Sequence, residues 1–444
     1  MKTKRDNYTF LTTAPVHRVI LTMAIPTIIS MLVTSLYNMV DTYFVGKINT
    51  QCTAAVGVSF SMMAIIQAVG FFCGHGSGNY ISQKLGAKQN EDAAVMAATG
   101  FFYSFSFGIV IAIVSHLFLD DIAVMLGSTP TILPYTRTYL GIILLGAPFM
   151  TSSFTMNNQM RFQGNALLAM VGIVTGAVLN VFLAPLFIFV FHMGIAGAAT
   201  ATLISQICSF CVLFAMTCSS RNIHILPRNF SFSSQLMKEI VAGGTPSLSR
   251  QGLGSLAVIM LNVAAGAFGD AAIAGMSIVS RSCFFVFSFI IGLGQGFQPL
   301  CGFCYGARLY SRVKEGYMYS VKLGTAFLIV VALVSFAFAE PIVAEFRDDP
   351  EVVIVGTAAL RWQLVTFPLM ATVIVSNMFM QTIRKPIRAN ILAAARSGLF
   401  FIPLVLILPK LWGRFGVVIC LAVADVFACA ITVPLVWSAF REMR

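Results

Sequence analysis

Two aspartates of this chain stand inside long apolar stretches, where a carboxylate is costly. Asp41 lies in the run from Pro26 to Gly46, which is long enough to cross a bilayer as a helix. An ionised carboxylate within a membrane helix costs roughly 2.5 to 3.5 kcal/mol on insertion scales, so it is usually protonated, paired or part of an ion pathway. The sequence therefore predicts that Asp41 takes up a proton or a small cation. The alternative is a helix-end aspartate whose side chain reaches the outer interface.

Asp425 is the second intramembrane acid, in the last apolar run of the chain. Arg250, Arg281 and Arg396 lie within apolar runs of the same half. A charge removed from water is tolerated when an opposite charge compensates it. We therefore interpret Asp425 as one partner of a structural ion pair with one of these arginines, and a second ion site is the alternative.

The composition places the whole chain in a membrane. Of its 444 residues, 58% are hydrophobic and only 10% are charged, far from the composition of a soluble globular protein. The first apolar run is too long for a signal peptide and no small-residue cleavage site follows it, so we expect it to stay attached. Apolar runs of helical length predict twelve transmembrane helices, at 16–45, 52–82, 92–119, 130–157, 164–191, 193–217, 234–268, 272–305, 313–339, 351–380, 386–409 and 414–440.

The basic residues indicate how these helices are oriented. Lys and Arg concentrate at both termini and in the even-numbered turns, for example at Lys84, Arg161 and Arg228, whereas the opposite turns carry the acidic pair Asp120 and Asp121. The positive-inside rule then predicts that both termini lie in the cytoplasm. We expect a multi-pass protein of the plasma (inner) membrane. The net charge of +12 does not indicate nucleic-acid binding, because the basic residues form no single patch or tail.

The sequence offers little support for metal binding or catalysis. Most of the ten cysteines lie in apolar stretches, which is typical of packing residues rather than of a disulfide framework. Cys301 and Cys304 have the spacing of a metal-binding pair, but no further ligands complete a site, so no metal is predicted. No nucleotide-binding loop or pair of nucleophile and base is found, so we predict no enzyme activity and no cofactor.

The two halves of the chain repeat each other. A shift of 220 residues brings Pro26 onto Pro246 and Asn157 onto Asn377, among many other matches. Each half holds six predicted helices, an even number, so both cross the membrane in the same direction. The predicted fold class is all-α, a polytopic membrane protein of twelve transmembrane helices in two parallel-repeat six-helix bundles. The predicted domains are an N-terminal bundle at 1–217, a cytoplasmic linker at 218–238 and a C-terminal bundle at 239–444.

The duplication favours a transporter. Two similar bundles that rock against each other can expose a shared cavity near the bilayer midplane to alternate sides. A receptor or a structural membrane protein explains neither the repeat nor Asp41, whose equivalent in the second half is Leu261. Pro26, in the same helix as Asp41, is the predicted hinge. We expect membrane lipid as a partner and a functional monomer.

Several motifs resemble the multidrug and toxic compound extrusion (MATE) family, and are most similar to its MepA-like bacterial branch. They occur in the expected order along a duplicated twelve-helix frame, so the resemblance covers the whole chain. The motifs are the stretches Asn38–Gly46, Leu179–Ile188, Met193–Thr202 and Gly294–Pro299, the last followed by Tyr305-Gly-Ala307.

The resemblance implies a secondary transporter that exports organic, often cationic, compounds in antiport with protons or sodium ions. In the family, the aspartate of the first helix joins a polar cluster, and the matching residues here are Asp41, Tyr139, Asn180 and Thr202. A carboxylate, an amide and two hydroxyls can hold a proton or a small hard cation. The family usually has an aspartate where this chain has Ala184, and the loss of that negative ligand favours protons over sodium.

A large cationic or aromatic substrate suits a cavity lined by methionine, aromatic and amide side chains. Residues of these types at membrane depth are the candidates, and for each of them ordinary packing is the alternative: Tyr37, Phe154, Met156, Asn157, Met276, Phe287 and Asn377. A flippase for a lipid-linked saccharide or another amphiphile is the alternative function, because the intramembrane arginines would suit a pyrophosphate group.

Overall fold

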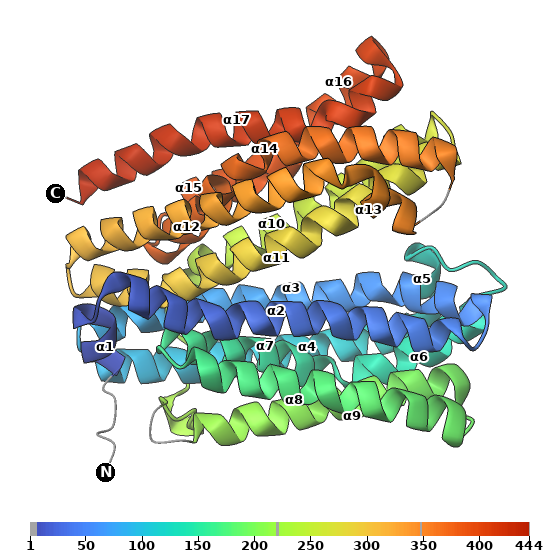
Figure 1. The fold of residues 1–444 in the computed structure, drawn as a ribbon. Coiled ribbons are helices and arrows are strands. Elements are labelled where there is room, and N and C mark those ends of the chain that lie inside the picture. Colours follow the sequence, from blue (N-terminus) through green and yellow to red (C-terminus); the bar gives the residue numbers. More distant parts are fainter. Residues whose placement is uncertain (1–6, 219–221, 347–348, 444) are drawn as a thin grey trace. The chain divides into compact units, whose positions relative to one another are not determined.

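The computed structural model describes residues 7–218, 222–346 and 349–443, with only the backbone of Asn38 and Asp270. The remaining terminal residues, on which the predicted side of the termini partly rests, lie outside these ranges. Regular structure throughout the described ranges is helical (Figure 1): α1 (Asn7–Thr13), α2 (Val16–Gly46), α3 (Thr50–Gly86), α4 (Asn90–Leu117), α5 (Leu119–Met125), α6 (Leu133–Leu145), α7 (Ala147–Phe162), α8 (Ala166–Pro185), η1 (Leu186–Val190), α9 (Gly194–Thr217), η2 (Pro227–Asn229), α10 (Ser234–Gly266), α11 (Asp270–Gly306), α12 (Tyr310–Ala337), α13 (Ala339–Phe346), α14 (Pro350–Thr382), α15 (Pro386–Ala394), η3 (Ala395–Phe400), α16 (Phe401–Trp412) and α17 (Arg414–Glu442).

The repeat seen in the sequence recurs helix by helix. α3 and α11 both contain 37 residues, and α4 and α12 both contain 28. The turns that follow α3 and α11 also match, because Lys88 and Arg308, which are equivalent in the repeat, both have a φ of 60°. Non-glycine residues rarely adopt this left-handed conformation, so the duplication extends to details of the backbone. The predicted all-α fold of two repeats is confirmed.

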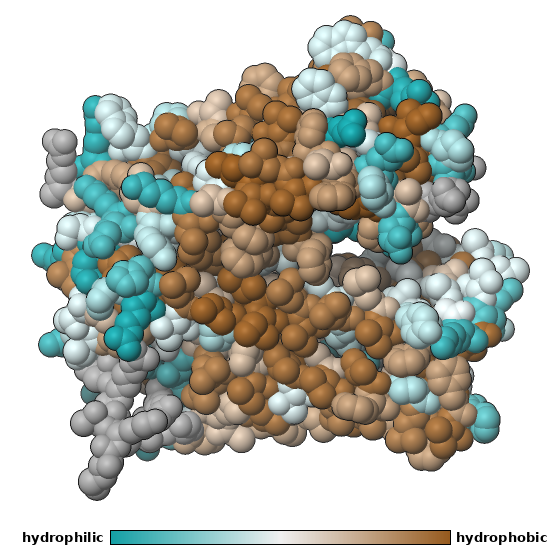
Figure 2. Space-filling model, in the orientation of Figure 1, coloured by the Kyte–Doolittle hydropathy of each residue, from teal (hydrophilic) through white to brown (hydrophobic). Residues whose placement is uncertain are grey.

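The helices have the length and composition of a membrane protein. Within the described residues, ten helical stretches are long and apolar enough to cross a bilayer, with α8 and η1 counted as one stretch and α15, η3 and α16 as another. α6 and α7, which are bent by 52° at their junction, make an eleventh if the pair is one span. α10 is not among these, because Arg250, Gln251 and several glycines make its sequence more polar. Large apolar side chains such as Leu117 and Phe182 are 73% and 70% exposed, and Figure 2 shows hydrophobic residues over the middle of the helices and hydrophilic ones toward their ends. The chain is therefore a multi-pass membrane protein.

Two predicted spans are interrupted by π-helical turns. The span at 164–191 consists of α8 followed by η1, and the span at 386–409 consists of α15, η3 and α16. π-Helical structure usually occurs in this way, as single turns within α-helices. The start of α15 lies 220 residues after the start of α8, whereas Gly413 lies 219 residues after Gly194. The offset between the halves therefore falls by one residue across these turns.

The helices form two compact units, each of which takes part of one helix that the repeat assigns to the other half. The first unit contains Ile25–Gly244 and a segment that ends at Leu11, and the second contains Thr12–Ala24 and Thr245–Arg444. α2 is thus divided between Ala24 and Ile25, and α10 is divided between Gly244 and Thr245. In both helices the second residue after the division is a proline, Pro26 or Pro246. The division in α10 falls after the predicted boundary at 239.

Close backbone packing explains why α10 is divided. A Cβ atom on Gly76 of α3 would lie 2.3 Å from the carbonyl oxygen of Ile240, so the start of α10 packs tightly against α3 in the first unit. The second unit has the equivalent packing, because a Cβ atom on Gly296 of α11 would lie 2.4 Å from the Cα atom of Ala24 in α2. Glycine permits such close approach because it has no side chain.

Candidate functional site

Four helices of the first unit bring a polar cluster together in an otherwise apolar bundle. α2 supplies Asp41 and Tyr37, which are four residues apart and therefore lie on one face of the helix. α6, α8 and α9 supply Tyr139, Asn180 and Thr202. All five side chains are buried. The four residues that the family resemblance grouped as a coupling-ion site thus converge in the structure.

The contacts within this cluster leave one polar atom without a partner. The Asn180 amide donates to the Thr202 hydroxyl oxygen at 3.0 Å. The side chains of Tyr37 and Tyr139 also interact with Thr202, and both lie close enough to Asp41 to interact electrostatically with its carboxylate. Asp41 is only 6% exposed, and among the described side chains its Oδ1 atom has no hydrogen-bond partner. A buried carboxylate oxygen is costly when it is unpaired. A proton or a small cation on Asp41 would remove that cost.

Tyr37 and Gln206 extend the cluster beyond the predicted set. Tyr37, a candidate for the substrate cavity, interacts here with Thr202 and Gln206. Gln206 was not a candidate, although it lies four residues after Thr202 and therefore on the same face of α9. The repeat also pairs Gln206 with Asp425 at an offset of 219, and that pairing was the signal available in the sequence.

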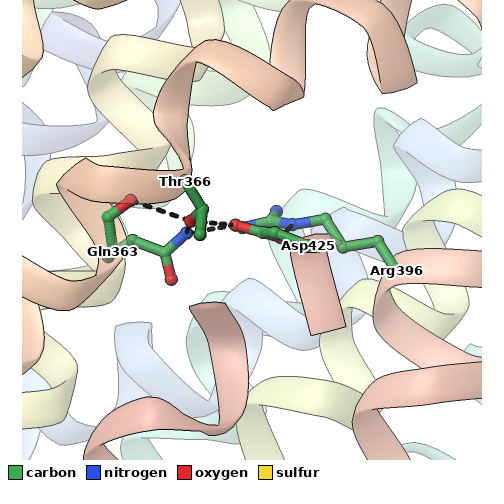
Figure 3. Close-up of polar contacts among 4 residues, drawn as sticks. All are labelled: Gln363, Thr366, Arg396 and Asp425. Atoms are coloured by element: carbon green, nitrogen blue, oxygen red, sulfur yellow. Dashed lines mark hydrogen bonds and ion pairs between the residues drawn. The ribbon is translucent and has the colours of Figure 1, made fainter. Parts of the chain in front are cut away.

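The second unit holds a separate buried polar site around Asp425 of α17. Figure 3 shows Arg396 on one side of this carboxylate and Gln363 and Thr366 of α14 on the other. Arg396 of η3 donates from Nε to Asp425 Oδ1 at 2.6 Å. Thr366 donates to Asp425 Oδ2 at 3.1 Å, and the Gln363 amide donates to the same oxygen. Asp425 is fully buried, and both of its oxygens are satisfied, as a buried charge requires.

Arg396 is the arginine that neutralises Asp425, which confirms the predicted ion pair and selects one of the three candidates. Its guanidinium also stacks on the Phe287 ring at 4.8 Å. Arg281 is exposed. Arg250 instead donates from Nη1 to Asn377 Oδ1 at 2.9 Å, and the described residues place no carboxylate within ion-pair distance of it.

The remaining candidates for a substrate cavity are divided between the two units. Met156 and Met276 are fully buried in the apolar cores of the first and second unit, respectively. Phe154 packs on Phe71, with 5.3 Å between ring centroids. Asn157 donates to the carbonyl oxygen of Ala169 at 2.8 Å. These contacts are those of packing residues, and a role in substrate binding stays a prediction.

Phe287 and Asn377 have polar neighbours in the second unit. Phe287 lies beneath Arg396, as described above, and also packs on Phe367. Asn377 accepts from Arg250 and donates to the carbonyl oxygen of Ala389 at 2.8 Å. Asn157 and Asn377 are equivalent in the repeat, and both donate to the residue twelve positions later. Their amide groups therefore have a structural role in each repeat, and a further role in substrate binding stays a prediction.

Comparison with known protein families gives the decisive observation. The MatE family model matches residues 26–186 and again residues 246–407. The chain belongs to the MatE family. The two matches begin at Pro26 and Pro246, the prolines that mark the repeat and stand next to the division of α2 and α10.

Relatives of this MatE protein match it over its whole length. It is 26% identical over 440 residues to the multidrug export protein MepA of Staphylococcus haemolyticus (strain JCSC1435), covering 98% of this chain and 96% of that protein. A solved structure described as the outward-facing conformation of a multidrug resistance MATE family transporter has a TM-score of 0.91, 25% identity and full coverage of both chains. A MOP superfamily transporter from Pyrococcus furiosus, reported with a binding pocket of reverse polarity, has the same TM-score and identity and covers 99% of this chain and 98% of that chain.

The residue before Pro185 adds no acid to the polar cluster of this MatE chain. Ala184 is fully buried in an apolar cluster that also contains Val45, Tyr139 and Ile188. No second carboxylate therefore enters from α8, and among the described residues Asp41 is the acid of this cluster. Throughout the described residues, no group of three or more His, Cys, Asp or Glu side chains could hold a metal ion.

Arg161 of this MatE chain does not behave like the exposed basic residues of a turn. The sequence placed it among the residues that report topology, but the structure buries it at the end of α7 with 2% exposure. It donates to Asn158 Oδ1 at 2.6 Å and lies 3.3 Å from His75 Nε2. Its polar neighbours, rather than water, stabilise its charge.

Proposed function

We propose that this protein is a secondary active transporter that exports organic, often cationic, compounds by antiport with protons. Two of its relatives support the substrate class, since one is named a multidrug export protein and the other is described as a multidrug resistance transporter. The duplicated bundles support alternating access, in which a central site opens to one side of the membrane at a time. The protein acts in the plasma membrane, as a monomer, with both termini in the cytoplasm.

The unpartnered carboxylate oxygen of Asp41 carries the proposal of ion coupling. An ion drives a conformational change only if it binds the two facing states with different affinity. Protonation removes the charge of a buried carboxylate and the cost of its unpaired oxygen. The protonated cluster therefore has a different preferred packing from the ionised one, and Asp41 is the residue at which the proton acts.

Protons suit this cluster better than sodium ions. A sodium ion is best held by several oxygen ligands with more than one negative charge among them, whereas a proton needs one carboxylate. Ala184 supplies no second acid, which supports proton coupling, and Tyr139, Asn180 and Thr202 then orient the carboxylate. Sodium ions remain the alternative and are tested below.

Pro26 supports a mechanical link between the cluster and the two units. Proline removes a helical hydrogen bond and allows a helix to bend. α2 carries Asp41 in the first unit, and its residues before Ile25 belong to the second unit. A change in packing at Asp41 can therefore be transmitted through a bend at Pro26.

Transport by the purified full-length protein in liposomes tests the proposal. A fluorescent organic cation is followed under an imposed proton gradient and, separately, under a sodium gradient, for the wild type and for Asp41→Asn. Asp121→Asn is the matched control, because Asp121 is an exposed acid of α5 outside the membrane helices. We expect proton-driven transport by the wild type and the control and none by Asp41→Asn.

Three results would argue against the proposal. Transport driven only by the sodium gradient would replace protons by sodium ions. Full transport by Asp41→Asn would make Asp41 a structural residue. Failure of the wild type to move any organic cation under either gradient would remove the proposed substrate class.

Arg250 supports a flippase or an exporter of anionic amphiphiles as a second candidate function. Its guanidinium is held by the neutral Asn377 rather than by a carboxylate, so its positive charge is available to an anionic group. A lipid-linked pyrophosphate is such a ligand. Accumulation of a lipid-linked precursor in cells that lack the protein, without any change in dye efflux, would favour this function.

A further inference from the structure

An apolar groove opens on the first unit, away from the polar cluster. Its volume is about 310 Å³, and its walls are phenylalanines of α4 and α9: Phe101, Phe102, Phe105, Phe210 and Phe214. Ile225 and Pro227, which follow α9, complete the lining. The volume lies at the lower end of the range for ligand pockets, and every lining side chain is apolar.

The phenylalanine rings support one another, so the groove is a built surface. Phe101 stacks on Phe105 and on Phe210 with centroid distances of 6.2 and 6.3 Å, and Phe210 stacks on Phe214 at 5.9 Å. Phe149 of α7 lies beneath them, 5.2 Å from Phe210. Offset aromatic contacts of this kind hold rings in defined orientations. The groove can therefore accept a slender apolar ligand without first rearranging its walls.

The segment after α9 places positive charge at one end of the groove. Arg228 directly follows the lining residue Pro227 and is exposed. Residues 218–238 contain no Asp or Glu. The first turn of α4 carries Glu91 and Asp92, of which Asp92 is paired with Lys84 at 2.8 Å. A ligand with an apolar chain in the groove would thus meet the guanidinium of Arg228 at the end of α9.

We propose that this groove binds one acyl chain of an anionic phospholipid whose phosphate lies at Arg228. α4 and α9 are membrane-spanning helices, so the apolar molecule most available to the groove is lipid. An acyl chain that moves from the bilayer hydrocarbon into an apolar groove gains little free energy. Selectivity for one lipid over another must therefore come from the head group. Basic residues at the membrane surface each favour anionic lipid by about fivefold. In the orientation proposed above, the lipid belongs to the cytoplasmic leaflet.

Quenching of a tryptophan in the groove by brominated lipids tests the proposal. The three native tryptophans, Trp362, Trp412 and Trp437, all lie in the second unit and are replaced by phenylalanine. Phe214→Trp then places the reporter in the groove, where Phe214 is 38% exposed. The full-length protein is reconstituted in phosphatidylcholine containing either brominated phosphatidylglycerol or brominated phosphatidylcholine. The ratio of the two apparent binding constants measures selectivity.

The matched control reporter is Leu167→Trp. Leu167 is 60% exposed near the start of α8 and does not line the groove. We expect phosphatidylglycerol to be favoured severalfold at Phe214→Trp and not at Leu167→Trp. Adding Arg228→Gln should lower that preference about fivefold. Phe210→Trp serves as the groove reporter if Phe214→Trp does not fold.

The proposal fails if the groove reporter shows no lipid preference, or if Arg228→Gln leaves a preference unchanged. Displacement of the brominated lipid by a transported organic cation, but not by unbrominated phosphatidylglycerol, would identify a substrate site and also overturn it. None of these results depends on whether the protein couples transport to protons, so they are distinct from the tests of function.

Discussion

Removing Arg396 should destabilise the second unit more than any other single change to its polar residues. Arg396→Met removes the cation paired with Asp425 at 2.6 Å and leaves a fully buried carboxylate with only two neutral donors. Breaking a buried ion pair in this way costs about 3 to 5 kcal/mol. For a unit of this size, that corresponds to a fall in melting temperature of about 6 to 20 °C.

Replacing Asp425 should cost less free energy of unfolding than replacing Arg396, because the two partners are buried to different degrees. The Arg396 side chain is 26% exposed and lies over the Phe287 ring, so Asp425→Asn leaves a cation that is partly solvated and still stacked. The carboxamide oxygen introduced by this change can still accept the hydrogen bonds from Gln363 and Thr366. We expect a loss of about 1 to 3 kcal/mol, and a double variant less destabilised than the sum of the two.

Tryptophan fluorescence on heating measures these differences, since all three tryptophans lie in the second unit. Membrane proteins often unfold irreversibly, so all variants must be heated at one rate in one detergent. A melting temperature for Arg396→Met within about 2 °C of the wild type would refute the reasoning, because it is far smaller than an unpaired buried charge allows. Additive effects in the double variant would show that the two side chains do not stabilise each other.

Three further changes have expected outcomes. Gly244→Ala should lower the melting temperature by several degrees, because the added Cβ would lie 2.2 Å from a backbone oxygen of α3. Gly252→Ala, which has open space around it, should be neutral or slightly stabilising. Equal melting temperatures for the two variants would contradict the close packing. Glu442→Gln should change stability by less than about 1 kcal/mol in the same assay, although it removes two ion pairs, because these pairs are exposed. Thr202→Val removes the acceptor of the 3.0 Å hydrogen bond from Asn180 and should reduce proton-driven transport in liposomes at least tenfold without preventing folding; unchanged transport would separate Thr202 from the coupling site.

Much of the fold could be predicted because duplication leaves a linear signal. The offset from Pro26 to Pro246 is visible without any tertiary information, and the long apolar runs give helix positions within a few residues. The π-turns η1 and η3 were not predicted, because hydropathy reports which residues are apolar and not the hydrogen-bond pattern within a helix. The division of α2 and α10 between units was also missed, since it depends on which distant backbone Gly76 and Gly296 approach.

The site residues divide in a similar way. Asp41 and Asp425 could be found from sequence because an acid in an apolar helix is conspicuous. The partner of Asp425 could not, because three arginines of the same half satisfy the same charge rule and only the fold brings Arg396 into contact. Gln363, Thr366 and Gln206 were missed because a neutral polar residue in a membrane helix is common and carries no charge to compensate.

The divided helices have a consequence for how such a protein can arise and be taken apart. Each unit is completed by a helical segment, Thr12–Ala24 or the residues from Ser234 to Gly244, that the repeat assigns to the other half. This is the arrangement of a domain-swapped dimer, here with both protomers in one chain. A single half on its own lacks the segment that completes its unit, and two copies of a half could complete each other only by exchanging their first helices. Cutting the chain between α9 and α10 should therefore yield two fragments that are unstable apart and that restore each other when made in the same membrane.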